Sequence, residues 1–211
     1  MSKTITRLFD EYSDATAAVS DLEALGISHG DISIVANNAH GHHGADDQDG
    51  INDRGDVSRG TSTGALLGGA GGLLAGLGLL AIPGLGPIVA AGWLAATAVG
   101  AGVGAAGGAV TGSLVGALKE SGHTEEEANV YSEGVRRGGT LVSAKVPDSQ
   151  IDEAEAVLDR NKPVDAATRG DAYRQSGWTK FDADAPTYTS DQVDQERARY
   201  GTSATATTSR Y

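Results

Sequence analysis

The chain of 211 residues contains no cysteine. This absence excludes disulfide bonds, thiolate metal sites and thiol-based catalysis together. Aromatic residues make up only 5% of the chain and hydrophobic residues 39%, so we do not expect a large conventional core. The formal net charge is -12 and no segment has an excess of basic residues. The sequence therefore lacks the positive surface that nucleic-acid binding requires.

Charged residues are also absent from one long segment, residues 61–118, which holds 17 of the 31 glycines. Uncharged apolar runs of about 18 residues or more are typical of membrane-spanning helices. The segment has room for two such helices, over residues 63–82 and 88–118, on either side of a helix-breaking turn. That turn is formed by Pro83, Gly84, Gly86 and Pro87. We therefore predict a helical hairpin of the transmembrane type.

Glycines recur every four residues in both arms of this predicted hairpin. On a helix this spacing places them along one stripe, where the missing side chains permit close packing of helices. The pattern predicts a glycine zipper within the hairpin and between copies of the chain. Its members are Gly64, Gly68, Gly72, Gly76, Gly92, Gly100, Gly104, Gly108, Gly112 and Gly116. Helices buried in a soluble oligomer, and a segment without fixed structure, are the alternatives.

The two flanks of the insert have the patterns of a small α/β domain. The first flank predicts a strand over 4–9, a helix over 14–25 capped by Ser13, and a strand over 31–36. In the second flank, Thr124 and Glu127 have the spacing of a capping box, which predicts a helix to about Arg137. A strand over 140–146, a helix over 149–161 and a weak strand over 164–168 follow. Neither flank buries much alone, so we expect them to complete one sheet.

The predicted fold class is therefore α+β, a ferredoxin-like split domain of β-α-β and α-β-α-β halves interrupted by the hairpin. The tail is predicted to be disordered, except that residues 177–189 (GWTKFDADAPTYT) offer Trp178, Phe181 and Tyr188 for docking, and a short helix follows over 191–199. The predicted division is 1–36, first half; 37–60, a flexible His/Asp/Gly linker; 61–118, the hairpin; 119–169, second half; and 170–211, the tail.

Patterns that suggest chemistry have simpler explanations in this chain. Residues 102–107 match G-x-G-x-x-G, but they lie within a predicted helix and not after a strand, as a dinucleotide site requires. The histidines of the linker (His40, His42 and His43) match no structural zinc spacing. The carboxylates of Glu125–Glu127 are explained by helix capping. The sequence thus predicts no enzyme, no cofactor, no metal site and no small-molecule substrate.

Two stretches resemble the bacterial general-stress-protein-like family: Pro83–Pro87 (PGLGP) and Tyr131–Gly139 (YSEGVRRGG). The resemblance covers about residues 3–170 and extends to the tail segment GWTKFDADAPTYT. Many members of that family have a glycine-rich hydrophobic insert that splits a small α/β domain. The resemblance implies a stress-associated, membrane-located protein of unsettled biochemical role, and it supplies no catalytic residues.

Together these features predict a non-enzymatic stress protein that inserts its hairpin into membrane lipid and forms a homo-oligomer. The expected location is the cytoplasmic membrane with both termini on the cytoplasmic side, since Arg54, Arg59 and Lys119 flank the insert. The alternative is a soluble, cytoplasmic oligomeric module for regulation or ligand binding, whose hairpin is buried in the assembly.

Overall fold

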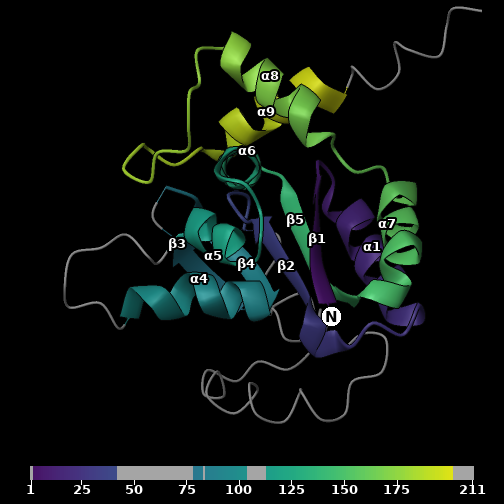
Figure 1. Ribbon diagram of the computed structural model, residues 1–211. Coiled ribbons are helices and arrows are strands. Elements are labelled where there is room, and N and C mark those ends of the chain that lie inside the picture. Colours follow the sequence, from purple (N-terminus) through teal and green to yellow (C-terminus); the bar gives the residue numbers. More distant parts are fainter. Residues whose placement is uncertain (1, 42–77, 83, 104–112, 202–211) are drawn as a thin grey trace, which may run out of the picture.

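A computed structural model shows a five-stranded antiparallel sheet covered by helices on both faces (Figure 1). It describes residues 2–41, 78–82, 84–103 and 113–201. The strand order is β1-β5-β2-β4-β3. The strands are β1 (Ser2–Phe9), β2 (Ile32–Asn37), β3 (Gly78–Ile82), β4 (Gly86–Gly92) and β5 (Thr140–Pro147). The mixed α+β class predicted from the sequence is confirmed.

The two flanks of the insert form one sheet, as predicted. Strand β5 of the second flank lies between β1 and β2 of the first and pairs antiparallel with both. Buried β2 has a strand on each side, because β4 of the insert pairs with its other edge. This pairing satisfies main-chain groups that would be costly to bury without partners.

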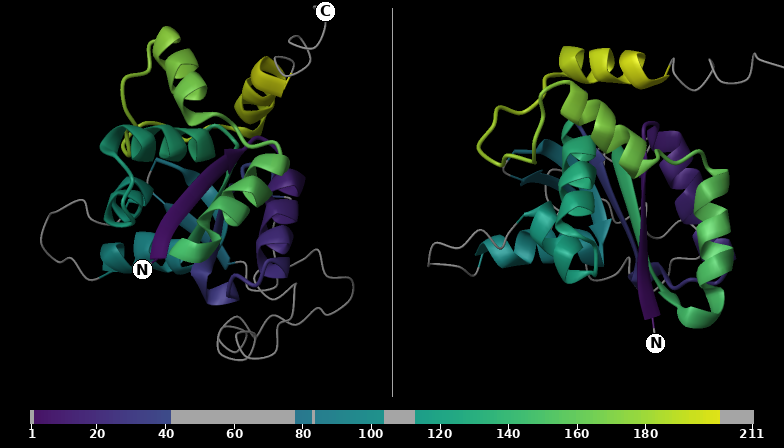
Figure 2. Two further views of the ribbon diagram at one scale, coloured as in Figure 1. Left: turned by 45° about the vertical axis from the view of Figure 1, so that its right-hand side comes forward. Right: turned by 45° about the horizontal axis from the view of Figure 1, so that its top comes forward.

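Helices cover both faces of this sheet (Figures 1 and 2). On one face α1 (Tyr12–Ala24) and α7 (Ile151–Arg160) pack together, and Val19, Leu22 and Leu158 are fully buried there. The other face is covered by α4 (Trp93–Val103), α5 (Leu114–Glu120) and α6 (Glu125–Arg136). Each face of the sheet therefore has its own hydrophobic core.

The residues that begin three helices confirm one prediction from the sequence and correct two others. Thr124 and Glu127 form the predicted capping box, in which each side chain bonds the main-chain N–H of the other residue. Helix α1 instead has Glu11 at its N-cap, so the prediction of Ser13 as the cap was wrong. The predicted strand over 164–168 was also wrong. Asp165 caps α8 (Ala166–Gln175) by accepting the Thr168 N–H at 2.7 Å, and only Val164 forms a bridge, to Leu8.

The uncharged insert differs most from its prediction. Residues on both sides of the predicted bend are strands β3 and β4, so the single helical arm over 88–118 was wrong. Ile88 and Val89 are β-branched, which favours a strand, and β4 completes the pairing of buried β2. Helices begin only at Trp93 and, after residues 104–112, at Leu114. Within the described parts of the chain, no helix is long and apolar enough to cross a membrane.

Apart from residues 177–189 and a helix over 191–199, the tail was predicted to be disordered, and this was wrong for residues 170–175, which belong to α8 (Ala166–Gln175). Helices α8 and α9 (Ser190–Gly201) lie near α6 at one end of the sheet (Figures 1 and 2). The predicted docking of residues 177–189 and a helix after it are confirmed. Phe181 is buried, and its main-chain N–H donates to Asn129 Oδ1 at 3.0 Å. Residues 202–211 lie outside the described part.

The docked tail contacts the turn between β3 and β4. A Cβ on Gly84, whose φ is +76°, would lie 2.6 Å from Ala183 Cα and 2.9 Å from Asp182 O. We expect Gly84→Ala to lose about 2 kcal/mol of unfolding free energy and to displace residues 181–187. Loss of hydrogen-exchange protection at the Phe181 amide measures the displacement.

Gly122→Ala is the matched control for this substitution. Gly122 also has a positive φ, +102°, but a Cβ there would meet nothing within 4 Å. It carries the backbone cost of about 1 kcal/mol without the contact. Equal losses in the two variants, with Phe181 still protected in both, would contradict the described docking.

Candidate functional site

The three predicted zipper glycines that the structure describes do not lie on one helical stripe. Among those described, Gly92 ends β4, Gly100 lies in α4 and Gly116 lies in the first turn of α5. The remaining ones, Gly64, Gly68, Gly72, Gly76, Gly104, Gly108 and Gly112, lie outside the described residues. Gly92 has a φ of +88°, and a Cβ there would lie 2.2 Å from Ile32 O of β2. The absence of a side chain at Gly92 therefore allows β4 to approach β2 closely.

The predicted hairpin turn does lie at a chain reversal, but the reversal joins two strands. Gly84 lies in the turn, whose Leu85 N–H donates to Ile82 O at 3.0 Å, and Gly86 and Pro87 begin β4. Pro83 lies outside the described residues. A Cβ on Gly86 would lie 3.1 Å from Thr187 Cβ of the tail. Both turn glycines thus form packing surface, for the chain's own C-terminal segment.

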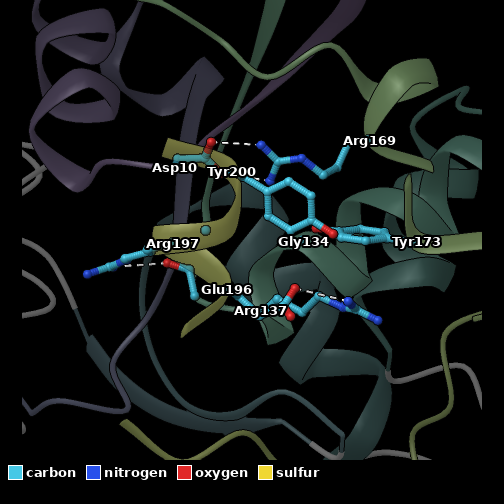
Figure 3. Close-up of a pocket in the computed structure, with 10 residues that line it drawn as sticks. Asp10, Gly134, Arg137, Arg169, Tyr173, Glu196, Arg197 and Tyr200 are labelled. Atoms are coloured by element: carbon cyan, nitrogen blue, oxygen red, sulfur yellow. Dashed lines mark hydrogen bonds and ion pairs between the residues drawn. The ribbon is translucent and has the colours of Figure 1, made fainter. Parts of the chain in front are cut away.

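A polar cluster at the carboxyl end of α6 was not predicted as a site (Figure 3). Its first part is the Glu133 carboxylate, which is fully buried. Arg137 Nε donates to Glu133 Oε1 at 2.7 Å, and Arg136 Nη1 donates to Oε2 at 3.2 Å. Both guanidinium groups of the Arg-Arg pair that ends the helix thus bind a buried carboxylate one turn earlier in the same helix.

Helix α9 completes the cluster from the far end of the sequence. Arg137 Nη1 donates to Glu196 Oε2 at 3.0 Å, and Arg197 Nη2 donates to Gly138 O at 3.1 Å. Val193, which is fully buried, packs against Gly138. The amphipathic pattern of α9 is weak in the sequence, so its docking rests on these polar contacts, on Val193 and on the ring of Tyr200, which contacts Tyr173.

A second ion pair fastens α8 to the end of β1. Both Arg169 Nη atoms donate to the two Asp10 carboxylate oxygens, at 2.8 and 2.7 Å. The Arg169 guanidinium also lies over the Tyr200 ring of α9, 4.2 Å from its centroid, and Arg137 lies at the same distance over Tyr173. These contacts stabilise planar cations between aromatic rings and carboxylates.

The electrostatics of the cluster keep Tyr173 and Arg137 in their ordinary charge states. Burial raises the pKa of the Tyr173 phenol well above its usual value, although Arg169 and Arg137 act in the opposite direction. Burial acts to lower the pKa of Arg137, but the bonds and charges of Glu133 and Glu196 outweigh it, so this pKa is raised. Tyr173 therefore stays neutral and Arg137 stays charged.

The space enclosed by this cluster is about 10 Å³, lined by Asp10, Gly134, Arg137, Gly138, Gly139, Arg169, Tyr173, Glu196, Arg197 and Tyr200. A volume of this size holds about one water molecule. The charged groups of the cluster form ion pairs with one another. The arrangement fastens α8 and α9 to the sheet, and we name the lining residues, together with Glu133, Arg136 and Val193, the α9 clasp.

A smaller polar cluster lies between the face of the sheet formed by β1 and β5 and the start of α6. Thr6 Oγ1 lies 2.7 Å from His123 Nε2 and 2.9 Å from Ser143 Oγ, and the Tyr131 hydroxyl donates to Thr6 O at 3.3 Å. Thr6 and Ser143 are buried, with 1% and 0% of their surface exposed. These hydroxyls are therefore partners within the core.

The imidazole of this cluster makes stability depend on pH. Burial lowers the pKa of His123 below its ordinary value of 6.5, and Glu127 acts weakly the other way. The unfolded chain therefore takes up a proton that the folded chain resists, so unfolding free energy falls as pH falls below about 6.5. We expect the urea midpoint to decrease from about pH 7 to pH 5.

His123→Gln is the variant that isolates this contribution. An amide keeps a hydrogen-bonding group beside Thr6 but takes up no proton in this range. The variant should lose the part of the pH slope that His123 supplies, while other groups keep theirs. An unchanged slope would show that His123 does not resist protonation in the folded protein.

The other candidate sites concern metal binding and an open groove on the surface. Within the described ranges, no group of three or more His, Asp or Glu side chains is positioned to hold a metal ion. His40, assigned from sequence to a flexible linker, is described, and its Nε2 lies 3.0 Å from Asp194 Oδ1 of α9. His42 and His43 lie outside the described residues. An open groove of about 410 Å³ beside Trp93, where the Lys145 ammonium lies 4.2 Å from the ring centroid, is shallow and polar.

No protein-family model, no curated protein and no solved structure matches the chain.

Proposed function

We propose that this protein is a non-enzymatic module that assembles with other copies of itself through its uncharged insert, residues 61–118. The observation that carries the proposal is the end of the sheet that the insert builds. Among the described residues no strand pairs with the outer edge of β3, and 67% of the Leu79 surface is exposed. An uncharged apolar strand edge favours pairing with another chain.

The domain that carries this insert, in our proposal, has a ferredoxin-like split arrangement. Elements β1, α1, β2, β5 and α7 follow in that order when the insert and α6 are left aside. Across the sheet, the Val164 bridge, β1, β5 and β2 lie side by side in that order, and α1 and α7 share one face. This order supports the arrangement, with the fourth strand reduced to one bridge.

The α9 clasp supports a structural role for the C-terminal segment. It joins α6, α8, α9 and the end of β1 through buried and partly buried ion pairs, and its cavity of about 10 Å³ leaves little space for a substrate. In our proposal the tail holds the β3–β4 turn in place, since residues 181–187 pack on Gly84 and Gly86. The insert is thereby presented as a fixed element.

A second candidate function is attachment to membrane lipid as a stress-associated protein of the family that the sequence resembles. The observation that favours it is the uncharged run itself, of which residues 61–77 and 104–112 lie outside the described part. In this hypothesis the α/β domain lies at the cytoplasmic face of the membrane with both termini on that side.

Sedimentation velocity of the full-length chain in detergent-free buffer, combined with flotation on vesicles of anionic and neutral lipid, tests both candidates. Assembly that rises with protein concentration without lipid supports the first proposal. Flotation of a chain that is monomeric in buffer supports membrane attachment. A monomer that does not float at any concentration contradicts both.

A further inference from the structure

The outer edge of β3 presents main-chain groups that can be assigned from the register. The Asn38 N–H donates to Pro87 O at 2.9 Å, so the main chain of Pro87 faces β2. Ala81 is the β3 partner of Pro87, and its N–H and C=O therefore point away from β4. Because main-chain direction alternates along a strand, those of Leu79 point the same way.

The opposite edge of the sheet, formed by β1, carries features that prevent pairing with another chain, and β3 can be compared with it. On β1, Lys3 and Arg7 form ion pairs with Glu155 and Asp159 of α7, and Leu8 bridges to Val164. Charges of this kind are how proteins prevent edge-to-edge pairing. Strand β3 has the sequence GLLAI, without charge or proline. The β1 edge is thus protected against pairing by charged side chains, and the β3 edge has no charged side chain of its own.

Charge decides which partner this edge favours. Each copy of the chain carries a net charge of -12, so two copies repel over most of their surfaces. The uncharged insert is the region where they can approach without placing like charges together. In an antiparallel sheet, a two-fold axis at the edge brings the same strand of each copy into register. A second copy therefore fits the edge both by charge and by symmetry.

We propose that β3 pairs antiparallel with β3 of a second copy, so that the two sheets become continuous across a two-fold axis. This inference rests on the proposed self-association and names its contact surface. The outward N–H and C=O groups of Leu79 and Ala81 form the bonds between copies, and the exposed Leu79 side chain packs across the junction. The contact is a strand edge, whereas the sequence predicted a stripe of glycines on helices.

Two substitutions within the insert separate these contact surfaces. Leu79→Lys places like charges at the β3 junction and, since Leu79 is 67% exposed, is compatible with the folded chain. Ala96→Lys places the same charge on an exposed position of α4, midway between Gly92 and Gly100 of the predicted glycine stripe. Sedimentation velocity should show a dissociation constant raised about tenfold or more by Leu79→Lys and changed by less than about twofold by Ala96→Lys.

Hydrogen exchange of the full-length protein adds a second measurement that charge alone does not affect. The Leu79 and Ala81 amides should gain protection as wild-type concentration rises, and Leu79→Lys should abolish the gain at Ala81. Circular dichroism checks that both variants keep their secondary structure, and Leu79→Glu repeats the test with the opposite charge. Should Leu79→Lys assemble like wild type, the edge contact is wrong and self-association stands. A wild-type chain that stays monomeric overturns both.

Discussion

Gly92→Ala should destabilise the protein by about 3 to 5 kcal/mol, the largest loss that we expect from adding one methyl group. Two costs act together at this position. The φ of +88° is unfavourable for any residue with a Cβ, and that Cβ would lie 2.2 Å from Ile32 O and 2.7 Å from Ser33 Cα. Both neighbours are main-chain atoms of β2, so they move only if β4 separates from β2. Urea unfolding followed by circular dichroism measures the loss.

Gly78→Ala is the control for this experiment. Gly78 lies in β3 of the same hairpin, but its φ is not in the positive range, and its Cβ would meet only Ala90 O at an ordinary 3.8 Å. Alanine is favoured over glycine within a strand, so we expect a change within about 0.5 kcal/mol. If Gly92→Ala were as mild as this control, β4 would not approach β2 as described.

The insert shows what the sequence was able to predict and where it stopped. Pro83, Gly84, Gly86 and Pro87 predicted the position of a chain reversal, because these residues break regular structure whatever surrounds them. The conformation of the arms depends instead on a partner far away in sequence. Strand β4 exists beside β2, roughly fifty residues earlier in the chain, whose edge it satisfies. A helical spacing of glycines carries no information about that edge.

The flanks were easier to predict because their determinants are local. The Thr124–Glu127 capping box predicted α6 correctly, because both of its residues lie within the first turn of the helix they begin. The α9 clasp had no such local pattern. Glu133 and Arg137 lie one turn apart in α6, but Glu196 follows Arg137 by 59 residues, and only the three-dimensional path of the tail brings it there. Its one available indication was the spacing of Glu133 from Arg136 and Arg137, three and four residues later, which places the three charges on one side of α6.

Glu133→Gln should be the most destabilising change of a charged group, with a loss of about 3 kcal/mol. The Glu133 side chain is fully buried, and its two oxygens accept bonds from Arg137 and Arg136 at 2.7 and 3.2 Å. Glutamine has nearly the same shape, so packing is retained. The amide removes the negative charge that compensates two partly buried guanidinium groups, and its NH₂ meets a donor where an acceptor is required. Urea unfolding of the full-length chain measures the loss.

Asp171→Asn is the matched control, since it also replaces a carboxylate that pairs with an arginine. Asp171 Oδ1 accepts from Arg174 Nη1 at 2.8 Å, but 71% of its side chain is exposed, so solvent screens the pair. We expect less than about 0.5 kcal/mol there. The two variants differ mainly in burial, and the difference between them measures what burial adds to the ion pair. Comparable small losses would mean that water reaches Glu133 and that α8 and α9 are held by the Val193 and aromatic contacts instead.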